Sequence, residues 1–182
     1  LEELDKFTSA VDIGIDLSSS SFFRENLYDY KTAEYTKEAH IEHLATIAKR
    51  YNLIYLEDPL NEEDFAGFAE LKRLIPDTII VGDDLTATHL DRVKKAVNER
   101  AISGVIIKPN QTGSLLEVRE IVEFCKKKKI KTIFSHRSGE TMDDVLADYA
   151  FGFGADFIKC GIATSWREAK LNRMIEIEKR LE

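Results

Sequence analysis

The sequence predicts an α/β fold in which parallel strands and helices alternate, as in a (β/α) TIM-type barrel that is incomplete in this chain. Two observations lead to this prediction. Short apolar runs rich in β-branched residues alternate along the chain with segments of helical periodicity. In addition, nearly every apolar run ends in a charged residue, and a barrel gathers the carboxyl ends of its strands at one mouth.

Six apolar runs are predicted to be strands, and each is followed by a predicted helix. The strands are Val11–Asp16, Ile54–Glu57, Ile79–Asp83, Gly104–Lys108, Thr132–Ser135 and Phe157–Lys159. The helices are Glu38–Tyr51, Phe65–Leu74, Leu90–Glu99, Leu115–Lys127, Asp143–Phe151 and Arg167–Leu181. Before the last helix, Ser165 and Glu168 have the spacing of a capping box, which satisfies the first free amides of a helix. Without a linker or a composition break, residues 1–182 are expected to belong to one domain.

The alternation of strands and helices is compatible with two architectures. An open, doubly wound sheet and a barrel both consist of parallel strands joined by right-handed crossovers. The chain has no GxGxxG or Walker A sequence to mark a nucleotide-binding turn. Polar residues at six successive strand ends favour the barrel, because an open sheet would spread them along an edge.

Composition excludes several classes of protein. The net charge of −7 argues against nucleic acid as the main partner, because phosphate neutralisation requires a basic surface. No apolar run approaches the ~20 residues of a membrane span. Two cysteines, Cys125 and Cys160, form no disulfide framework, and we therefore expect a reduced, cytoplasmic location.

The most informative segment is the loop Phe134-Ser135-His136-Arg137-Ser138-Gly139-Glu140-Thr141, directly after a short apolar run. Arg137 offers a planar fork for a phosphate group, and Ser138 adds a hydroxyl donor. His136 is of the residue type that titrates near physiological pH. We therefore expect this loop to bind an anion.

Three carboxylates end three successive predicted strands: Asp16, Glu57 and Asp83. Brought together they would repel one another, and a hard divalent cation such as Mg²⁺ resolves that repulsion with oxygen ligands. The neighbouring Asp58 and Asp84 are instead interpreted as helix caps or hydrogen-bonded loop carboxylates.

Two lysines, Lys108 and Lys159, end strands that are otherwise apolar. Each is either extended toward solvent at the rim of the sheet or held within the barrel mouth. In the mouth, a nearby cation would disfavour the ammonium form and allow a lysine to act as a base. A lysine base combined with a metal suits abstraction of a proton next to a carboxylate.

These motifs together resemble the C-terminal barrel of the enolase family, from about Ile13 to the end of the chain. The matching blocks are Ile13-Gly14-Ile15-Asp16, Leu56-Glu57-Asp58-Pro59, Gly82-Asp83-Asp84-Leu85-Thr86, Ile107-Lys108-Pro109-Asn110-Gln111-Thr112-Gly113, the Ser135–Thr141 loop, and Phe157-Ile158-Lys159-Cys160-Gly161. The resemblance implies dehydration of 2-phosphoglycerate to phosphoenolpyruvate in glycolysis.

The resemblance also implies a role for each site residue. Asp16, Glu57 and Asp83 would bind Mg²⁺, and Lys108 would take the C2 proton. Arg137 and Ser138 would hold the substrate phosphate, with Ser138 also contacting a second magnesium ion. His136 would line the pocket, and Lys159 would pair with the substrate carboxylate. A homo-oligomer, either a dimer or an octamer, is implied for the full-length protein.

The sequence also departs from the family pattern. Enolases have an N-terminal capping domain and a β2α2(βα)6 barrel, and this chain matches only the last six units. The catalytic acid that protonates the leaving hydroxyl has no counterpart here, so we expect the chain by itself to be inactive or poorly active. Two alternatives remain: a naturally truncated, non-catalytic binding or structural protein, and another lysine-base lyase or racemase, although the Arg137-Ser138 pair disfavours the latter.

Overall fold

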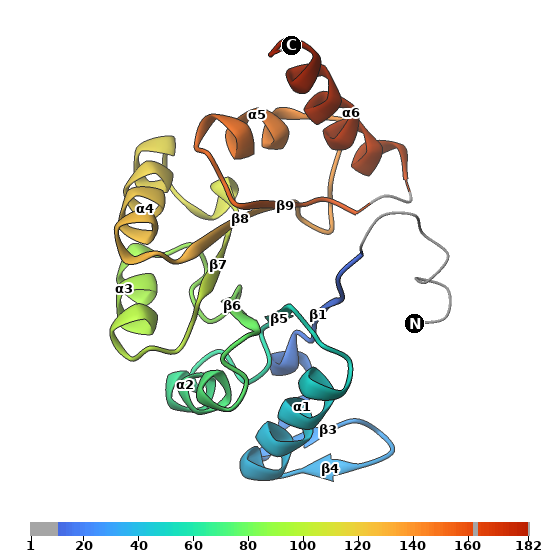
Figure 1. Cartoon of the computed structure of the whole chain (residues 1–182), viewed down its shortest axis with the longest axis vertical. Coiled ribbons are helices and arrows are strands. Elements are labelled where there is room, and N and C mark those ends of the chain that lie inside the picture. The colour runs from blue at the N-terminus through green and yellow to red at the C-terminus, as the bar shows by residue number, and fades with distance from the viewer. Residues whose placement is uncertain (1–10, 162–163, 182) are drawn as a thin grey trace. The chain divides into compact units, whose positions relative to one another are not determined.

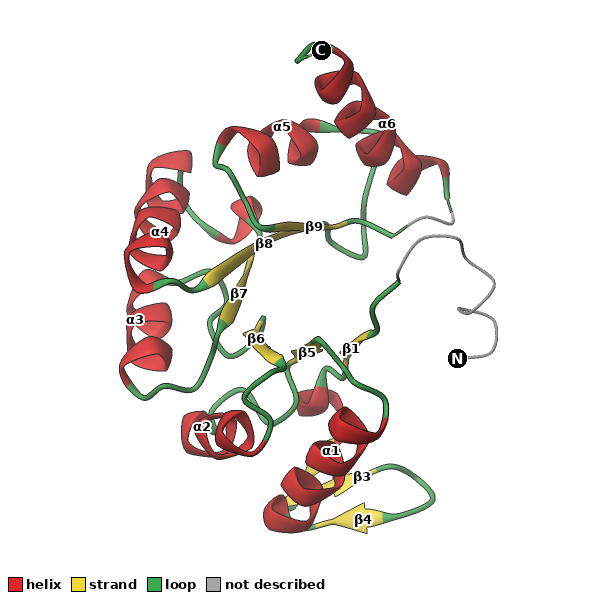
Figure 2. Cartoon of the chain, in the orientation of Figure 1, coloured by secondary structure: helices red, strands yellow, loops and turns green. Residues whose placement is uncertain are grey.

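The computed structural model describes residues 11–161 and 164–181. The chain divides into two compact units. The first comprises Leu1–Leu85 with Glu99–Ile102, and the second comprises Thr86–Asn98 with Ser103–Glu182. Each unit contains three parallel strands and at least two helices. Figure 2 colours the helices red and the strands yellow. No described helix is long and apolar enough to cross a membrane.

The parallel strands of the first unit lie in the order β1, β5, β6. Its main elements are β1 (Gly14–Asp16), α1 (Lys37–Arg50), β5 (Tyr55–Glu57), α2 (Phe65–Leu74) and β6 (Ile79–Gly82). In register, Asp16 pairs with Glu57, and Glu57 pairs with Val81. Asp16, Glu57 and Val81 are therefore level with one another across the three strands, and Asp83 lies two residues beyond this level.

The first unit also contains a small antiparallel sheet that the sequence patterns did not predict. It consists of β2 (Phe23–Arg24), β3 (Leu27–Asp29) and β4 (Glu34–Tyr35), and a 3-10 turn, η2 (Ser19–Phe22), precedes it. The sheet packs against α1 (Figure 1). Strands of two or three residues are too short to show periodicity, and the turns between them use non-glycine residues in the left-handed region, including Asn26 and Lys31.

The small sheet and α1 hold the segment that follows β5. His40 of α1 is fully buried and stacks on Tyr28 of β3, with ring centroids 3.9 Å apart. Its Nε2 donates a hydrogen bond to the carbonyl of Pro59 at 2.9 Å. The hydroxyl of Tyr28 accepts from the amide of Asn61 at 3.0 Å. Both contacts fix the backbone directly after the Glu57-Asp58 pair.

Burial of His40 predicts an acid-sensitive contribution to stability. Burial lowers the pKa of His40 from 6.5 to about 4, so the folded state favours the neutral ring. The unfolded chain binds a proton more readily, and the contribution is therefore fully present above pH 6.5 and lost as the pH falls toward 4. A shift of this size corresponds to about 3 kcal/mol.

Urea denaturation between pH 7 and 4 measures this contribution. His40→Gln, which keeps a side-chain donor but cannot gain a charge, is expected to lose this part of the pH dependence. His43→Gln is the control, because it removes a half-buried imidazole from the same helix. A His40→Gln variant with the pH slope of the unsubstituted chain would contradict the assignment.

The second unit has its parallel strands in the order β7, β8, β9. Its elements are α3 (Leu90–Asn98), β7 (Gly104–Ile107), the 3-10 turn η3 (Pro109–Gln111), α4 (Leu115–Lys128), β8 (Lys131–Ser135), α5 (Val145–Gly152), β9 (Phe157–Lys159) and α6 (Ser165–Lys179). Every residue of β7 is buried. Burial on both faces explains why this strand is a continuous apolar run in the sequence.

The structure corrects several predicted boundaries. Strands β6 and β7 end one residue earlier than predicted, so Asp83 and Lys108 lie just after their strands. The predicted capping box at Ser165 is wrong. Helix α6 has Thr164 at its N-cap, and the carbonyl of Thr164 accepts from the amides of both Arg167 and Glu168 at 2.9 Å. Backbone bonding therefore begins this helix without a side-chain cap.

Candidate functional site

The three predicted carboxylates lie at the carboxyl ends of three adjacent strands in the first unit. Asp16 is the last residue of β1, Glu57 is the last residue of β5, and Asp83 directly follows β6. Their environments differ: Glu57 is 0% exposed, Asp83 is half-buried and Asp16 is exposed. A fully buried carboxylate requires hydrogen bonds or a compensating positive charge.

Glu57 has a hydrogen-bond partner that the sequence patterns did not indicate. Tyr55 lies two residues before it on β5, on the same face of the strand, and its hydroxyl donates a hydrogen bond to Glu57 Oε2. Burial raises the pKa of the Tyr55 phenol strongly, and the Glu57 charge raises it further. The phenol therefore remains a donor and fixes one oxygen of the Glu57 carboxylate. In the sequence, the only sign of this hydrogen bond is a tyrosine two positions before an acidic residue within an apolar strand.

Asp58 makes the contacts expected of a structural residue. It is 4% exposed and has a positive φ of 40°. Its two carboxylate oxygens accept from the amides of Asp83 and Asp84, at 2.8 Å and 2.7 Å. Burial raises the pKa of Asp58 to about 7, although these amide bonds oppose the shift. The interpretation of Asp58 as a hydrogen-bonded loop carboxylate is confirmed.

The same contacts produce a second acidic grouping. Among the described residues, carboxylate oxygens of Asp58, Asp83 and Asp84 lie within 4.8 Å of one another, close enough for one cation. This grouping shares Asp83 with the predicted set of Asp16, Glu57 and Asp83. Both oxygens of Asp58 already accept backbone amides, which favours a role in shaping the Asp83-Asp84 turn.

In the second unit, the loop from Ser135 to Thr141 begins at the last residue of β8 and is hydrogen-bonded to β9. Ser135 and Lys159 pair in register, and the amide of His136 donates to the carbonyl of Lys159 at 2.9 Å. The Arg137 amide donates to Glu140 Oε1 at 2.7 Å, closing the loop on itself. These bonds place His136, Arg137 and Lys159 at the carboxyl ends of β8 and β9.

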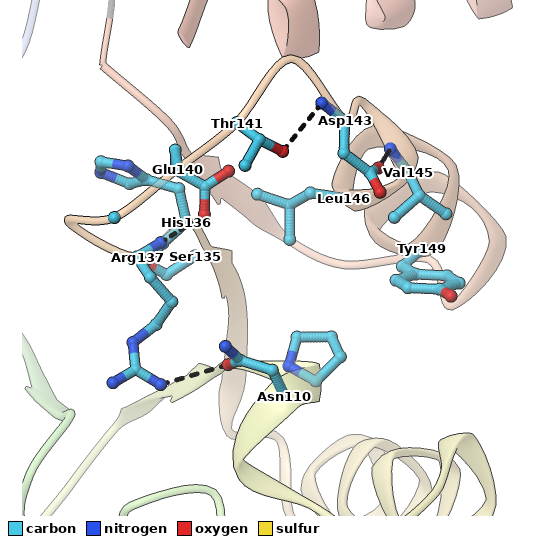
Figure 3. Close-up of a pocket in the computed structure, with 12 residues that line it drawn as sticks. Asn110, Ser135, His136, Arg137, Glu140, Thr141, Asp143, Val145, Leu146 and Tyr149 are labelled. Carbon is cyan, nitrogen blue, oxygen red and sulfur yellow. Dashed lines mark hydrogen bonds between the residues drawn. The ribbon is translucent and has the colours of Figure 1, made fainter. Parts of the chain in front are cut away.

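Two side chains of this loop point in different directions (Figure 3). The guanidinium of Arg137 extends toward Asn110 of η3, and its Nη1 donates to Asn110 Oδ1 at 3.2 Å. The ring of His136 points away from it. Burial lowers the pKa of His136, and the nearby cations of Arg167 and Lys159 lower it further. The ring is therefore neutral at neutral pH, and its buried Nδ1 makes no hydrogen bond with the described residues.

The remaining predicted residues have varied environments. Ser138, at the tip of the loop, is exposed, and Lys159, the last residue of β9, is half-buried. Lys108 is also half-buried, and its amide donates to Thr88 Oγ1 at 3.1 Å. Thr88 has a positive φ of 54° and also donates to Gln111 at 2.6 Å, so it fixes the chain around Lys108. Sequence patterns gave no indication of Thr88.

A pocket of about 250 Å³ lies between the Ser135–Thr141 loop and α5 (Figure 3). Its lining includes Asn110, Ser135, His136, Arg137, Glu140 and Tyr149. The loop contributes most of the polar groups, and Leu146 and Tyr149 contribute an apolar wall from α5. Arg137 therefore lines this pocket together with two acidic residues, Glu140 and Asp143.

Comparison with known proteins identifies the family. The model of the family described as "Enolase, C-terminal TIM barrel domain" matches residues 3–182. The chain belongs to this family. The enolase barrel assigned from the sequence motifs is therefore confirmed, and so is the α/β barrel fold class.

Curated relatives of this enolase barrel carry the same name. The protein "Enolase" from Sulfurisphaera tokodaii is 44% identical over 167 residues, which cover 91% of this chain and 40% of the relative. "Enolase" from Pyrobaculum aerophilum is 44% identical over 169 residues, 92% of this chain and 40% of the relative. "Enolase" from Picrophilus torridus is 41% identical over 169 residues, with 92% and 42% covered. The chain thus spans about two-fifths of the length of the curated relatives it matches.

Proposed function

We propose that this chain forms the metal-binding and substrate-binding barrel of an enolase that converts 2-phosphoglycerate to phosphoenolpyruvate and water. One observation supports this more than any other. Within a chain that matches the enolase barrel over residues 3–182, a carboxylate ends or follows each of three adjacent strands, and an arginine-serine loop follows another. We also propose that the enzyme is cytoplasmic and homo-oligomeric, as a dimer or an octamer.

The carboxylates of the first unit suit a magnesium ion. Asp16, Glu57 and Asp83 would provide oxygen ligands, which Mg²⁺ prefers. The buried position of Glu57 favours such an occupant, because a carboxylate removed from water is stabilised by a cation next to it. When bound, the ion would stabilise negative charge that develops on the substrate carboxylate.

The groups of the second unit suit the rest of the reaction. Lys108 in its amine form would take the C2 proton, and the electrons of the broken C–H bond would move into the substrate carboxylate. Lys159 would pair with that carboxylate, while Arg137 and Ser138 would hold the phosphate. Departure of hydroxide from C3 then requires an acid. We assign no residue of this chain to that role, and propose that the acid lies in the part of the relatives that the match leaves out.

Two preparations test the proposal. The first is the chain alone with Mg²⁺ and 2-phosphoglycerate. The second is a chimera in which residues 11–182 replace the matching segment of the Sulfurisphaera tokodaii enolase. The chimera is expected to form phosphoenolpyruvate, detected by its ultraviolet absorbance, and the chain alone is expected to form little or none. Robust turnover by the chain alone would contradict the proposal that the catalytic acid lies outside this chain. A folded but inactive chimera would contradict the proposed function.

Arg137→Ala tests phosphate recognition separately. The variant is expected to weaken binding of 2-phosphoglycerate by about 10–100-fold, because a charge-assisted hydrogen bond contributes about 1.5–3 kcal/mol. Binding of glycerate, which lacks the phosphate, should change little. Titration of the chimera by calorimetry measures both. Arg119→Ala, on the exposed face of α4, is the matched control. Equal losses for the two ligands would argue for one of the non-phosphorylated substrates of a different lyase or racemase.

A further inference from the structure

A buried lysine of α6, Lys170, contacts the Ser135–Thr141 loop, to which the proposed function assigns anion binding. Its side chain is only 1% exposed, although no enolase role assigned above uses it. A buried ammonium is costly unless each of its hydrogens has an acceptor. Lys170 Nζ has three: the carbonyl of Thr141 at 2.7 Å, the carbonyl of Trp166 at 2.9 Å and Glu140 Oε2 at 2.7 Å. Two of these three acceptors belong to the end of the loop.

Glu140 extends this contact to the start of the loop. Its Oε2 binds Lys170, while its Oε1 accepts the amide of Arg137 at 2.7 Å. Burial of Glu140 raises its pKa, but the bonds from the Arg137 amide and Lys170 outweigh this effect and lower the pKa overall. The carboxylate therefore stays ionised at neutral pH and connects Lys170 to the backbone of Arg137.

The tip of the loop has little other support. Ser138 and Gly139 are exposed, and a Cβ placed on Gly139 would have no atom within 4 Å. The loop conformation between Arg137 and Thr141 therefore depends on hydrogen bonds rather than on packing. Holding donors in place before a ligand arrives reduces the entropy lost on binding.

We propose that Lys170 is a positioning residue that, through Glu140, holds the backbone of Arg137 and Ser138 in the conformation that receives the substrate phosphate. The inference rests on the proposed function only in identifying the anion as a substrate phosphate. The Lys170–Glu140 pair is a property of the second unit itself, and its effect on the loop can be measured without substrate.

Lys170→Met, in the 182-residue chain, tests this role. Methionine retains most of the apolar stem and removes the ammonium. Two quantities are measured by NMR: hydrogen exchange of the Arg137 amide, and the dissociation constant for inorganic phosphate. Lys170→Met is expected to accelerate exchange at Arg137 by at least about tenfold and to weaken phosphate binding by a similar factor. Unchanged exchange at Arg137 would overturn the inference.

A structural role for Lys170 in α6 alone is distinguished by a matched variant. Ile177→Ala removes another buried side chain of α6 and is expected to lower the melting temperature without changing exchange at Arg137. If Ile177→Ala accelerates that exchange as much as Lys170→Met, Lys170 acts through helix stability and the inference fails. Should Lys170→Met not fold, Glu140→Gln provides the same test, because it weakens the link to both Lys170 and Arg137.

Failure of the proposed function would give different experimental results from failure of the positioning role. If the unsubstituted chain binds no phosphate while Lys170→Met still accelerates exchange at Arg137, the positioning role holds and the phosphate assignment fails. If Arg137→Ala leaves phosphate affinity unchanged, phosphate binds elsewhere on the chain, and the assignment fails in the same way.

Discussion

Lys108→Met is expected to slow exchange of the C2 proton of 2-phosphoglycerate by about 10²–10⁴-fold, the range for loss of a positioned general base. Methionine retains the length and the apolar stem of lysine but cannot accept a proton. Exchange reports on deprotonation alone, so it does not depend on the acid that expels hydroxide. The measurement follows loss of the C2 signal by proton NMR when the chimera is incubated with substrate and Mg²⁺ in deuterated water.

The matched control is Lys127→Met, which removes an exposed lysine near the end of α4. It should exchange the C2 proton at the unsubstituted rate. Lys159→Met provides the complementary comparison, because Lys159 is assigned to the substrate carboxylate and its loss should weaken binding. Retention of exchange in Lys108→Met, together with its loss in Lys159→Met, would reverse the two assignments.

Glu57→Gln is expected to have the second large effect, the loss of most Mg²⁺ affinity. The substitution preserves volume and removes the charge of the buried carboxylate among the proposed ligands. Tyr55→Phe should reduce affinity by about 10–100-fold, as expected for a residue that orients a ligand. Calorimetric titration of the 182-residue chain with Mg²⁺ measures both, and Glu99→Gln is a control with the same charge change on an exposed residue of the first unit.

Two further variants separate the acidic groupings around Asp83. If Mg²⁺ is bound by Asp16, Glu57 and Asp83, then Asp16→Asn weakens binding and Asp84→Asn does not. The reverse result would assign the ion to the cluster of Asp58, Asp83 and Asp84. Equal affinities for Glu57→Gln and the unsubstituted chain would remove Glu57 from the proposed set.

Sequence patterns predicted the repeating elements because their signals are long and periodic. The bounds of α2 agree with the prediction at Phe65 and Leu74, and the apolar run Gly104–Ile107 is a fully buried strand. Charged residues after apolar runs are visible in any such sequence, so the candidate site residues could be listed without coordinates. Their confirmation as ligands or as a base awaits the experiments above.

The features that escaped prediction depend on contacts between distant residues or on very short segments. Lys170 occupies a polar position in a helix, and nothing local distinguishes it from a solvated lysine. Its burial arises from the loop 29 residues away, where Thr141 accepts its hydrogen bond. Likewise, Tyr55 differs from an ordinary strand tyrosine only in its bond to Glu57, and the small sheet from Phe23 to Tyr35 has strands too short to show a period.

If Glu57 binds a cation as proposed, the buried ring of His40 would also couple acidity to metal occupancy. His40 contributes no ligand, but it holds the carbonyl of Pro59, two residues after Glu57. A proton on His40 favours loosening of that segment, whereas a cation bound by Glu57 favours its order. By thermodynamic linkage each opposes the other. Mg²⁺ should therefore extend the acid tolerance of the fold, and mild acid should release the ion through a residue that never contacts it.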